Sequence, residues 1–168
     1  MRRFLYLFIG LFFIVSCSFA QKAKYHEQII VKLAQHVRWS DLNSDYKFTI
    51  GIIGSSDDFR YFQSIDFTVD KISDGPVEIR YFECTDNIDQ CDLIYISEDC
   101  SLNIKSIVNQ TIDDPILIIS GKEGYGAAGS VINFIDKQGK ISFELNQSQA
   151  QERGLIISDT LKSLAILI

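Results

Sequence analysis

Three short apolar runs in the middle of this 168-residue chain restrict its fold more than any other feature. They are KFTIGIIG at residues 47–54, DLIYIS at residues 92–97 and ILIIS at residues 116–120. A continuous apolar run without polar alternation is typical of a parallel strand that is buried on both faces. Such strands need helices on both sides, so the runs predict an α/β fold with a mostly parallel sheet flanked by helices.

Segments with helical periodicity separate these runs. Residues 23–37, 56–65 and 104–112 each place apolar side chains on one helical stripe, and residues 77–83 are strand-like after the Gly75-Pro76 turn. The resulting order is strand, helix, strand, strand, helix, strand, which is typical of an α/β sandwich. No internal break indicates a second domain, so we expect one domain over residues 21–168.

The last third of the chain predicts how the sheet ends. Residues 130–135 and 140–145 are strand-like and are joined by residues 136–139, a four-residue loop ending in glycine, as in a hairpin built on a type I turn. Asn146 and Ser158 are placed as the N-caps of two short helices, the second with an apolar stripe through Ile168. We therefore expect a C-terminal antiparallel β-hairpin at a sheet edge, followed by closing helices.

The first twenty residues are typical of a signal peptide. A basic start precedes an apolar segment, residues 4–15, that is too short to span a membrane comfortably. Small residues at −3 and −1 predict cleavage between Ala20 and Gln21. Residues 14–17 also form a tolerable lipobox, and cleavage before Cys17 would leave a lipid-anchored protein. In either case we expect export from the cytoplasm; retention of an uncleaved anchor is a third reading.

The mature chain predicted by this cleavage is acidic. Loss of Arg2 and Arg3 takes the formal net charge from −6 to −8. Phosphate binding needs clustered Lys and Arg, and the sequence has no basic run. We therefore expect no nucleic acid partner and no anionic lipid partner, and no direct membrane insertion after cleavage.

No motif predicts an active site. Residues 124–129 spell G-x-G-x-x-G after a strand, but a strand rather than a helix is expected next, which favours a turn over a dinucleotide site. His26 and His36 point to different faces of the predicted first helix, and the cysteine spacing matches no zinc site. We therefore expect no cofactor, no metal site and no enzymatic activity.

The positions of the cysteines restrict which disulfide can form. Cleavage after Ala20 leaves Cys84, Cys91 and Cys100. Cys91 should lie at the start of its strand and Cys100 beyond the end of the same strand, which is too far for a bridge. Cys84 ends the preceding strand at the same sheet edge as Cys100. If a disulfide forms, the predicted pair is therefore Cys84 with Cys100.

In order and spacing, the pieces of the mature chain resemble the YfiR family of small periplasmic bacterial proteins. The likeness covers IVKLAQHVRWSD (30–41), residues 48–54, CDLIYIS (91–97), residues 116–120, GSVINF (129–134), SFELN (142–146), and Gly154-Leu155 followed by residues 157–164. One departure is Ser40, where the family often has proline. The resemblance implies a periplasmic regulator that binds the sensor portion of an inner-membrane diguanylate cyclase and lowers cyclic-di-GMP output.

The resemblance also implies that redox state influences partner binding in the family, but we do not expect this response in this chain. Cys91 matches a family cysteine, but the position of its family partner is occupied by Gly51 or one of its neighbours. The second family cysteine pair falls around residues 126–133, where this chain has no cysteine.

The first hypothesis for function is a binding protein that regulates a membrane sensor, either a diguanylate cyclase or a histidine kinase. Aromatic and Arg side chains dominate interface hot spots, so Arg38, Trp39 and Tyr46 are candidate partner contacts. Packing in the core is the alternative role for Trp39. The sequence also leaves open whether the protein forms a homodimer.

The alternative hypothesis is a periplasmic small-ligand-binding protein that feeds a sensor histidine kinase. In open α/β sheets ligands bind beyond the carboxyl ends of the parallel strands. The residues expected there are Ser55, Ser97 and Gly121.

Overall fold

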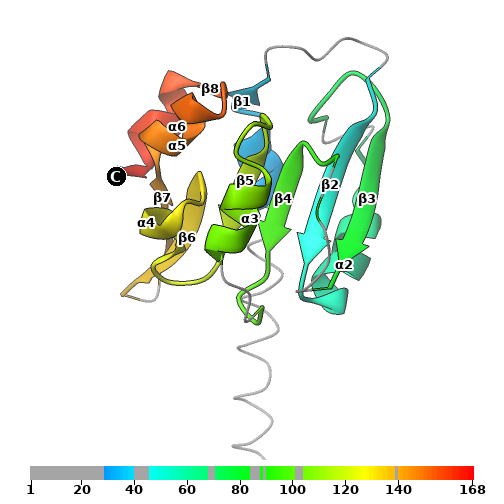
Figure 1. Ribbon diagram of the computed structural model, residues 1–168, viewed down its shortest axis with the longest axis horizontal. Coiled ribbons are helices and arrows are strands. Elements are labelled where there is room, and N and C mark those ends of the chain that lie inside the picture. Colours follow the sequence, from blue (N-terminus) through cyan, green and yellow to red (C-terminus); the bar gives the residue numbers. More distant parts are fainter. Residues whose placement is uncertain are drawn as a thin grey trace, which may run out of the picture.

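A mixed sheet forms the centre of the molecule (Figure 1). The computed structural model describes residues 29–39, 46–67, 71–83, 88, 90–100, 104–138 and 140–168. Within these residues seven strands pair in the order β3-β2-β4-β5-β6-β7-β9. Their bounds are β2 (Phe48–Ile53), β3 (Val77–Phe82), β4 (Leu93–Ile96), β5 (Leu117–Ser120), β6 (Ile132–Lys137), β7 (Lys140–Leu145) and β9 (Ile166–Leu167).

The strand directions confirm the predicted fold class. β3, β2, β4, β5 and β6 are parallel, β7 is antiparallel to β6, and β9 is parallel to β7. The five parallel strands have the order of a doubly wound sheet, in which the chain reverses its direction of travel between β2 and β4. The protein is therefore an α/β domain with a mostly parallel sheet and a C-terminal antiparallel hairpin.

Helices cover both faces of the sheet. They are a first helical segment at residues 29–34, α2 (Ser56–Gln63), α3 (Ile104–Gln110), α4 (Tyr125–Ala128), α5 (Gln147–Glu152) and α6 (Asp159–Leu164). The first segment, α2, α5 and α6 contribute to one buried cluster, and α3 and α4 pack against the other. In Figure 1 α3 lies in front of the sheet and α2 behind it. The fold thus has three layers.

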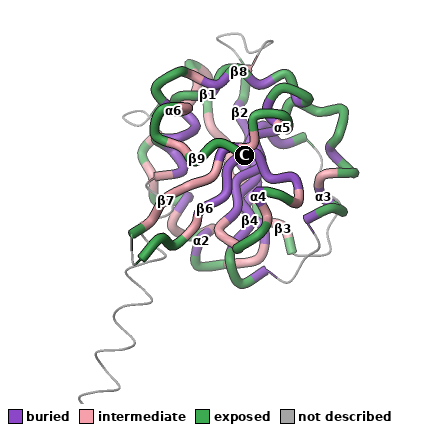
Figure 2. Tube along the Cα trace, turned by 90° about the vertical axis from the view of Figure 1, so that its left-hand side faces the viewer, coloured by how far each residue is buried: buried purple, intermediate pink, exposed green. Residues whose placement is uncertain are grey.

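The central strands are buried on both faces, which explains why their sequences are continuously apolar. Every residue of β2, β4 and β5 is buried (Figure 2). In β4, Leu93 and Tyr95 join one core cluster, whereas Ile94 and Ile96 join the other. Burial of each such side chain stabilises the fold by about 1.5–3 kcal/mol relative to exposure.

Three helices begin at side-chain caps, two of which, Asn146 and Ser158, are predicted from the sequence. The side-chain oxygens of Ser55, Asn146 and Ser158 each accept a hydrogen bond from the backbone N–H three residues further on, at 3.1–3.2 Å. These bonds satisfy backbone donors that the first helical turn leaves unpaired. The helix starts are therefore encoded locally.

The hairpin loop is shorter than the sequence predicts. β6 continues to Lys137, which pairs with Lys140, so Asp136 and Lys137 belong to the ladder instead of the loop. Gln138 has a φ of 58°, as in two-residue hairpin loops whose twist matches that of the strands. Gly139 lies outside the described residues. The prediction of a four-residue loop was wrong because strand pairing extends to the tip of the hairpin.

The final helix is also shorter than the sequence predicts. It ends at Leu164, Ala165 is extended, and Ile166–Leu167 pair with β7 as strand β9. Leu164 and Ile168, which the helical stripe placed in the core, are 67% and 45% exposed. A short apolar segment fits either periodicity, and pairing with the open edge of β7 satisfies its backbone groups.

A two-stranded antiparallel sheet lies at the amino ends of the parallel strands. It joins β1 (Val37–Arg38) to β8 (Ile156–Ile157), at the top of Figure 1. The first helix was predicted to continue through Val37, but it ends at residue 34 and the chain then pairs with β8. This pairing brings the start of the fold against its closing segment.

A buried arginine ties α5 to the end of α3. The Arg153 side chain is 3% exposed, and its guanidinium donates hydrogen bonds to the carbonyl oxygens of Thr111 at 2.7 Å and Asp114 at 3.3 Å. It also donates to the carbonyl of Val108 at 3.4 Å. Carbonyls at a helix C-terminus lack helical partners, and a positive charge there is favourable.

Replacement of Arg153 by alanine should lower the free energy of unfolding by about 2–4 kcal/mol, because it leaves buried carbonyl groups unpaired. Urea unfolding followed by circular dichroism measures the change. Arg60→Ala is the matched control, since that side chain is 73% exposed and pairs with Asp57, an exposed neighbour on its own helix; it should change stability little. Equal effects of the two substitutions would contradict the role assigned to Arg153.

Candidate functional site

The three predicted contact residues lie near the amino end of β2, and two of them have structural partners. Arg38 is exposed and pairs with Ile156 in the β1–β8 ladder. Trp39 is half-buried against the core, with its ring edge-on to that of Phe48 at 5.0 Å between centroids. Arg38 therefore faces solvent, whereas Trp39 packs against the core.

The third predicted contact, Tyr46, is bonded to a buried carboxylate. Its hydroxyl donates to Oδ1 of Asp92 at 2.9 Å, and the backbone N–H of Thr49 donates to Oδ2 at 2.7 Å. Asp92 is 7% exposed. Burial raises the pKa of Asp92 above its ordinary value of 3.8, although both hydrogen bonds act in the opposite direction. Asp92 thus holds the segment of Tyr46 against β2 and β4.

The free energy of unfolding of the wild type, relative to that of Asp92→Asn, should be greatest in acid. Because its pKa is raised in the folded state, its protonated form adds stability that is complete below the ordinary value of 3.8 and is lost as pH rises through the folded pKa. In asparagine the amide oxygen can accept from the Thr49 N–H and the amide nitrogen can donate to the Tyr46 hydroxyl, and the side chain cannot titrate. The stability difference, wild type minus Asp92→Asn, should therefore fall as pH rises from 3 toward 7.

Urea unfolding of both proteins across this pH range gives the difference directly. The matched control is Asp159→Asn, because it makes the same substitution at a side chain that is fully exposed, at 100%. A flat difference for Asp92→Asn, or one that rises with pH, would contradict the raised pKa.

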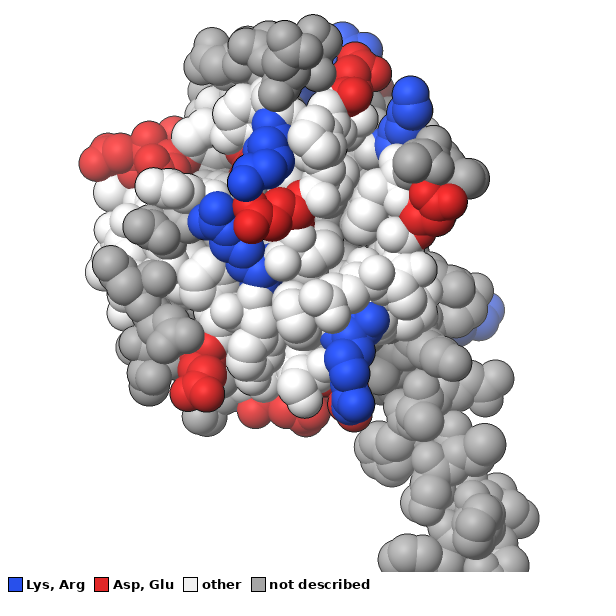
Figure 3. Space-filling model, turned by 90° about the vertical axis from the view of Figure 1, so that its right-hand side faces the viewer, with Lys and Arg blue, Asp and Glu red and all other residues white. Residues whose placement is uncertain are grey.

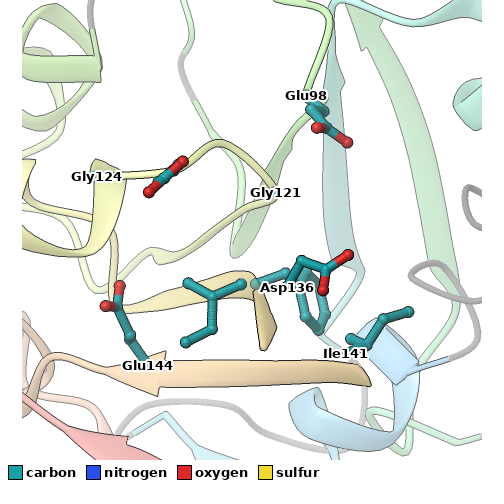
Figure 4. Close-up of a pocket in the computed structure, with 9 residues that line it drawn as sticks. Glu98, Gly121, Gly124, Asp136, Ile141 and Glu144 are labelled. Carbon is teal, nitrogen blue, oxygen red and sulfur yellow. The ribbon is translucent and has the colours of Figure 1, made fainter. Parts of the chain in front are cut away.

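A hollow lies at the carboxyl ends of β5 and β6, the region in which a ligand cleft was expected. It has a volume of about 320 Å³ and is lined by Glu98, Gly121, Glu123, Gly124, Phe134, Ile135, Asp136, Ile141 and Glu144 (Figure 4). Of the three residues predicted there, Gly121 lines it. Ser55 caps α2, and Ser97 is buried with its backbone N–H bonded to Ile53, so neither of them lines the hollow.

A buried chain of polar side chains leads to this hollow. The Ser120 hydroxyl donates to Oδ1 of Asn133 at 2.6 Å, and Nδ2 of Asn133 donates to Oε2 of Glu144 at 3.1 Å. Ser120 and Asn133 are both 0% exposed. A β-carbon at Gly126 would collide with the Glu144 carboxylate, so that carboxylate is also packed against the backbone of α4. This chain of side chains was not predicted, because its members lie far apart in the sequence and form no local pattern.

The glycine-rich segment at residues 124–129 contains a helix that the sequence analysis took for a turn. α4 occupies Tyr125–Ala128, and the chain then enters β6. At Gly129, with φ of 123°, a β-carbon would lie 2.7 Å from the Val108 side chain of α3. Close packing against α3 accounts for this glycine without a bound nucleotide.

The structure places two of the cysteines. Cys100 is disulfide-bonded, whereas Cys91 is a buried thiol. Cys84 and Cys17 lie outside the described residues, so the pairing of Cys84 with Cys100 stays a prediction. The cleavage residues Ala20 and Gln21 lie outside them as well.

Position 51 faces the Cys91 thiol across β2 and β4. A β-carbon added to Gly51 would lie 2.9 Å from Sγ of Cys91. The resemblance puts the missing family cysteine at Gly51 or one of its neighbours, and Gly51 is close enough to Cys91 to be that position. The chain therefore has one half of that bridge and a glycine where the other half would stand.

Gly51→Cys should form a disulfide with Cys91, because the new β-carbon would lie within bonding reach of the Cys91 sulfur, with a small shift of the neighbouring Phe82 ring. Intact mass and thiol titration of the oxidised, unfolded protein would detect a loss of two hydrogens and the loss of the Cys91 thiol. Gly51→Cys combined with Cys91→Ser is the control and should retain one reactive thiol. Two titratable thiols in the single variant would show that the positions do not meet.

The described residues provide neither a metal site nor a membrane span. Within them, no three His, Cys, Asp or Glu side chains are grouped to hold a metal ion, and no helix has the length and apolarity to cross a bilayer. On the face in Figure 3 acidic and basic side chains are interspersed among neutral ones. At the β3 edge, for example, Glu78 pairs with Lys47 at 2.8 Å and with Arg80 at 3.1 Å.

These features define the class of the protein as a three-layer α/β domain with a hollow at the carboxyl edge of its sheet. A family model described as YfiR/HmsC-like matches residues 23–166, and the chain therefore belongs to the YfiR/HmsC-like family. The family is known for regulators in cyclic-di-GMP signalling and is regulatory rather than catalytic. No curated protein matches the chain.

Proposed function

We propose that the protein is a non-enzymatic regulator that binds the sensor region of an inner-membrane protein from the periplasm. Membership of a family of cyclic-di-GMP signalling regulators supports this role. A diguanylate cyclase is the partner that the family favours, and a histidine kinase is the second option.

An exposed apolar surface at the end of the chain is the observation that carries the proposal. Leu164, Ile166, Leu167 and Ile168, which we call the C-terminal apolar surface, are 67%, 37%, 49% and 45% exposed. Successive exposed apolar side chains are typical of protein interaction sites. β9 is also the last strand of the sheet, and no strand of the described residues pairs with its outer edge. Such an edge can pair with a partner strand.

The disulfide at Cys100 supports a location outside the cytoplasm. Disulfides persist in oxidising compartments such as the periplasm and are rare where thiols are kept reduced. We propose removal of residues 1–20 and a periplasmic location, with lipid anchoring through Cys17 as the alternative. The intact mass of the purified mature protein distinguishes a chain that starts at Gln21 from one lipidated at Cys17.

A second candidate function is favoured by the hollow next to Gly121. A periplasmic small-ligand-binding protein that feeds a sensor histidine kinase would use a cavity at this edge of the sheet. This candidate predicts a ligand, whereas the first predicts only a protein partner.

Leu164→Glu and Leu167→Glu should each reduce recovery of a membrane sensor by about tenfold or more, because a buried charge in an interface opposes binding. The measurement is in-cell crosslinking and pulldown of the mature protein, quantified by mass spectrometry. For a cyclase partner, cellular cyclic-di-GMP should rise in both variants. Both side chains are exposed, so folding should be preserved.

The matched control is Ile112→Glu, an equally apolar exposed residue that follows α3, in the opposite helical layer. It should leave sensor recovery unchanged. Recovery of no membrane sensor with the unaltered protein would refute the proposed regulation. Recovery of a second copy of this chain alone would identify the C-terminal apolar surface as a homodimer contact instead.

A further inference from the structure

The two outer strands of the central sheet carry different side chains. β3 presents Glu78 and Arg80, and Glu78 pairs with Arg80 and with Lys47. Charged side chains on an edge strand oppose its pairing with a further strand. At the other end of the sheet, residues 164–168 read LAILI and carry no charge, and both residues of β9 are exposed (Figure 2). The β9 edge therefore lacks the protection that the β3 edge has.

The backbone of Leu167 points away from the sheet. The N–H of the next residue, Ile168, donates to the carbonyl oxygen of Leu145 at 3.1 Å, and the carbonyl oxygen of Ile168 accepts from the N–H of Gln147 at 3.4 Å. Both backbone groups of Ile168 thus face the β7 side. Successive residues of a strand direct these groups to opposite sides, so those of Leu167 face outward. Within the described residues no strand pairs with that outer side, and such an edge is a template for a strand from another chain.

Apolar side chains flank this edge on both faces of the sheet. Leu167 is paired with Leu145, a member of the core cluster to which α5 and α6 contribute, so the Leu167 side chain lies on that face. Ile166 and Ile168 lie on the opposite face, where Cδ1 of Ile168 would be 3.0 Å from a β-carbon at Gly126 of α4. An added strand would therefore meet apolar side chains on both faces. A helix bonds its own backbone internally, so it has no groups to offer the Leu167 backbone.

We propose that an extended, uncharged segment of the membrane sensor adds to β9 as a further strand of the sheet. Its backbone pairs with the N–H and C=O of Leu167, and its alternate side chains pack beside Leu167 on one face and beside Ile166 and Ile168 on the other. A charge in the pairing stretch would lose water without gaining a partner, because residues 164–168 carry none. The inference rests on the proposed regulator function and specifies how the C-terminal apolar surface recognises its partner.

Leu167→Pro tests the backbone pairing, because proline removes the Leu167 N–H and leaves the bonds of Ile168 toward β7 in place. In-cell crosslinking and pulldown of the mature variant should recover about tenfold or more less membrane sensor than the unaltered protein. Leu167→Ala is the matched control. It removes more of the apolar side chain than proline does but keeps the N–H, so its loss of sensor should be at least about threefold smaller. An equal or greater loss with alanine would overturn strand addition in favour of contact through side chains alone.

Ile168→Pro separates loss of pairing from loss of folding. It removes the N–H that donates to Leu145, so it should lower the urea concentration at the midpoint of unfolding. Leu167→Pro should leave that midpoint unchanged, because the Leu167 N–H faces outward. An equal fall of the midpoint in the two variants would show that the fold uses the Leu167 N–H, which would overturn the free edge on which the inference depends.

The same pulldown distinguishes failure of this inference from failure of the regulator function. Sensor recovery that is unchanged in Leu167→Pro overturns strand addition and leaves the regulator proposal intact. Recovery of no membrane sensor with the unaltered protein refutes the regulator proposal, and strand addition with it. A second copy of this chain crosslinked at β9, with no sensor, would overturn the sensor segment as the occupant of this edge.

Discussion

Burial of β2, β4 and β5 on both faces is the constraint on which the rest of this structure depends. Every residue of these strands is buried, and their apolar side chains are divided between two apolar clusters, so the helical layers on both sides are required for the sheet to be stable. Polar chemistry is then confined largely to strand ends and sheet edges. Asp92 stands at the amino end of β4, and Glu98 follows its carboxyl end. The candidate sites lie where the two-sided burial stops.

The features that sequence reasoning predicted correctly are those with local causes. A strand that is buried on both faces has no polar alternation, and for that reason the run at residues 92–97 predicted β4 at Leu93–Ile96 within one residue at each end. An N-cap bonds a backbone N–H only three residues away, so Asn146 and Ser158 could be recognised without knowledge of the fold. The family resemblance likewise depended on the order of such local pieces.

The features that sequence reasoning missed depend on partners far along the chain. Leu164 and Ile168 fit a helical stripe, and only the open edge of β7 decides that the chain leaves the helix and forms β9. Arg153 would be expected on a surface, yet carbonyls about forty residues earlier draw it into the interior. The path from Ser120 through Asn133 to Glu144 joins three strands. None of these contacts has a periodicity or a motif.

The two candidate partner-binding surfaces also differ in whether they follow from the sequence or from the fold. Composition alone favoured Arg38, Trp39 and Tyr46, because interfaces are rich in Arg and aromatic residues. Trp39 and Tyr46 already have partners in Phe48 and Asp92, so the fold accounts for both residue types without a second protein. The C-terminal apolar surface has the opposite character. Its exposed side chains oppose solubility, and nothing within the described fold requires them to be apolar, which makes this edge of the sheet the stronger candidate for contact with another protein.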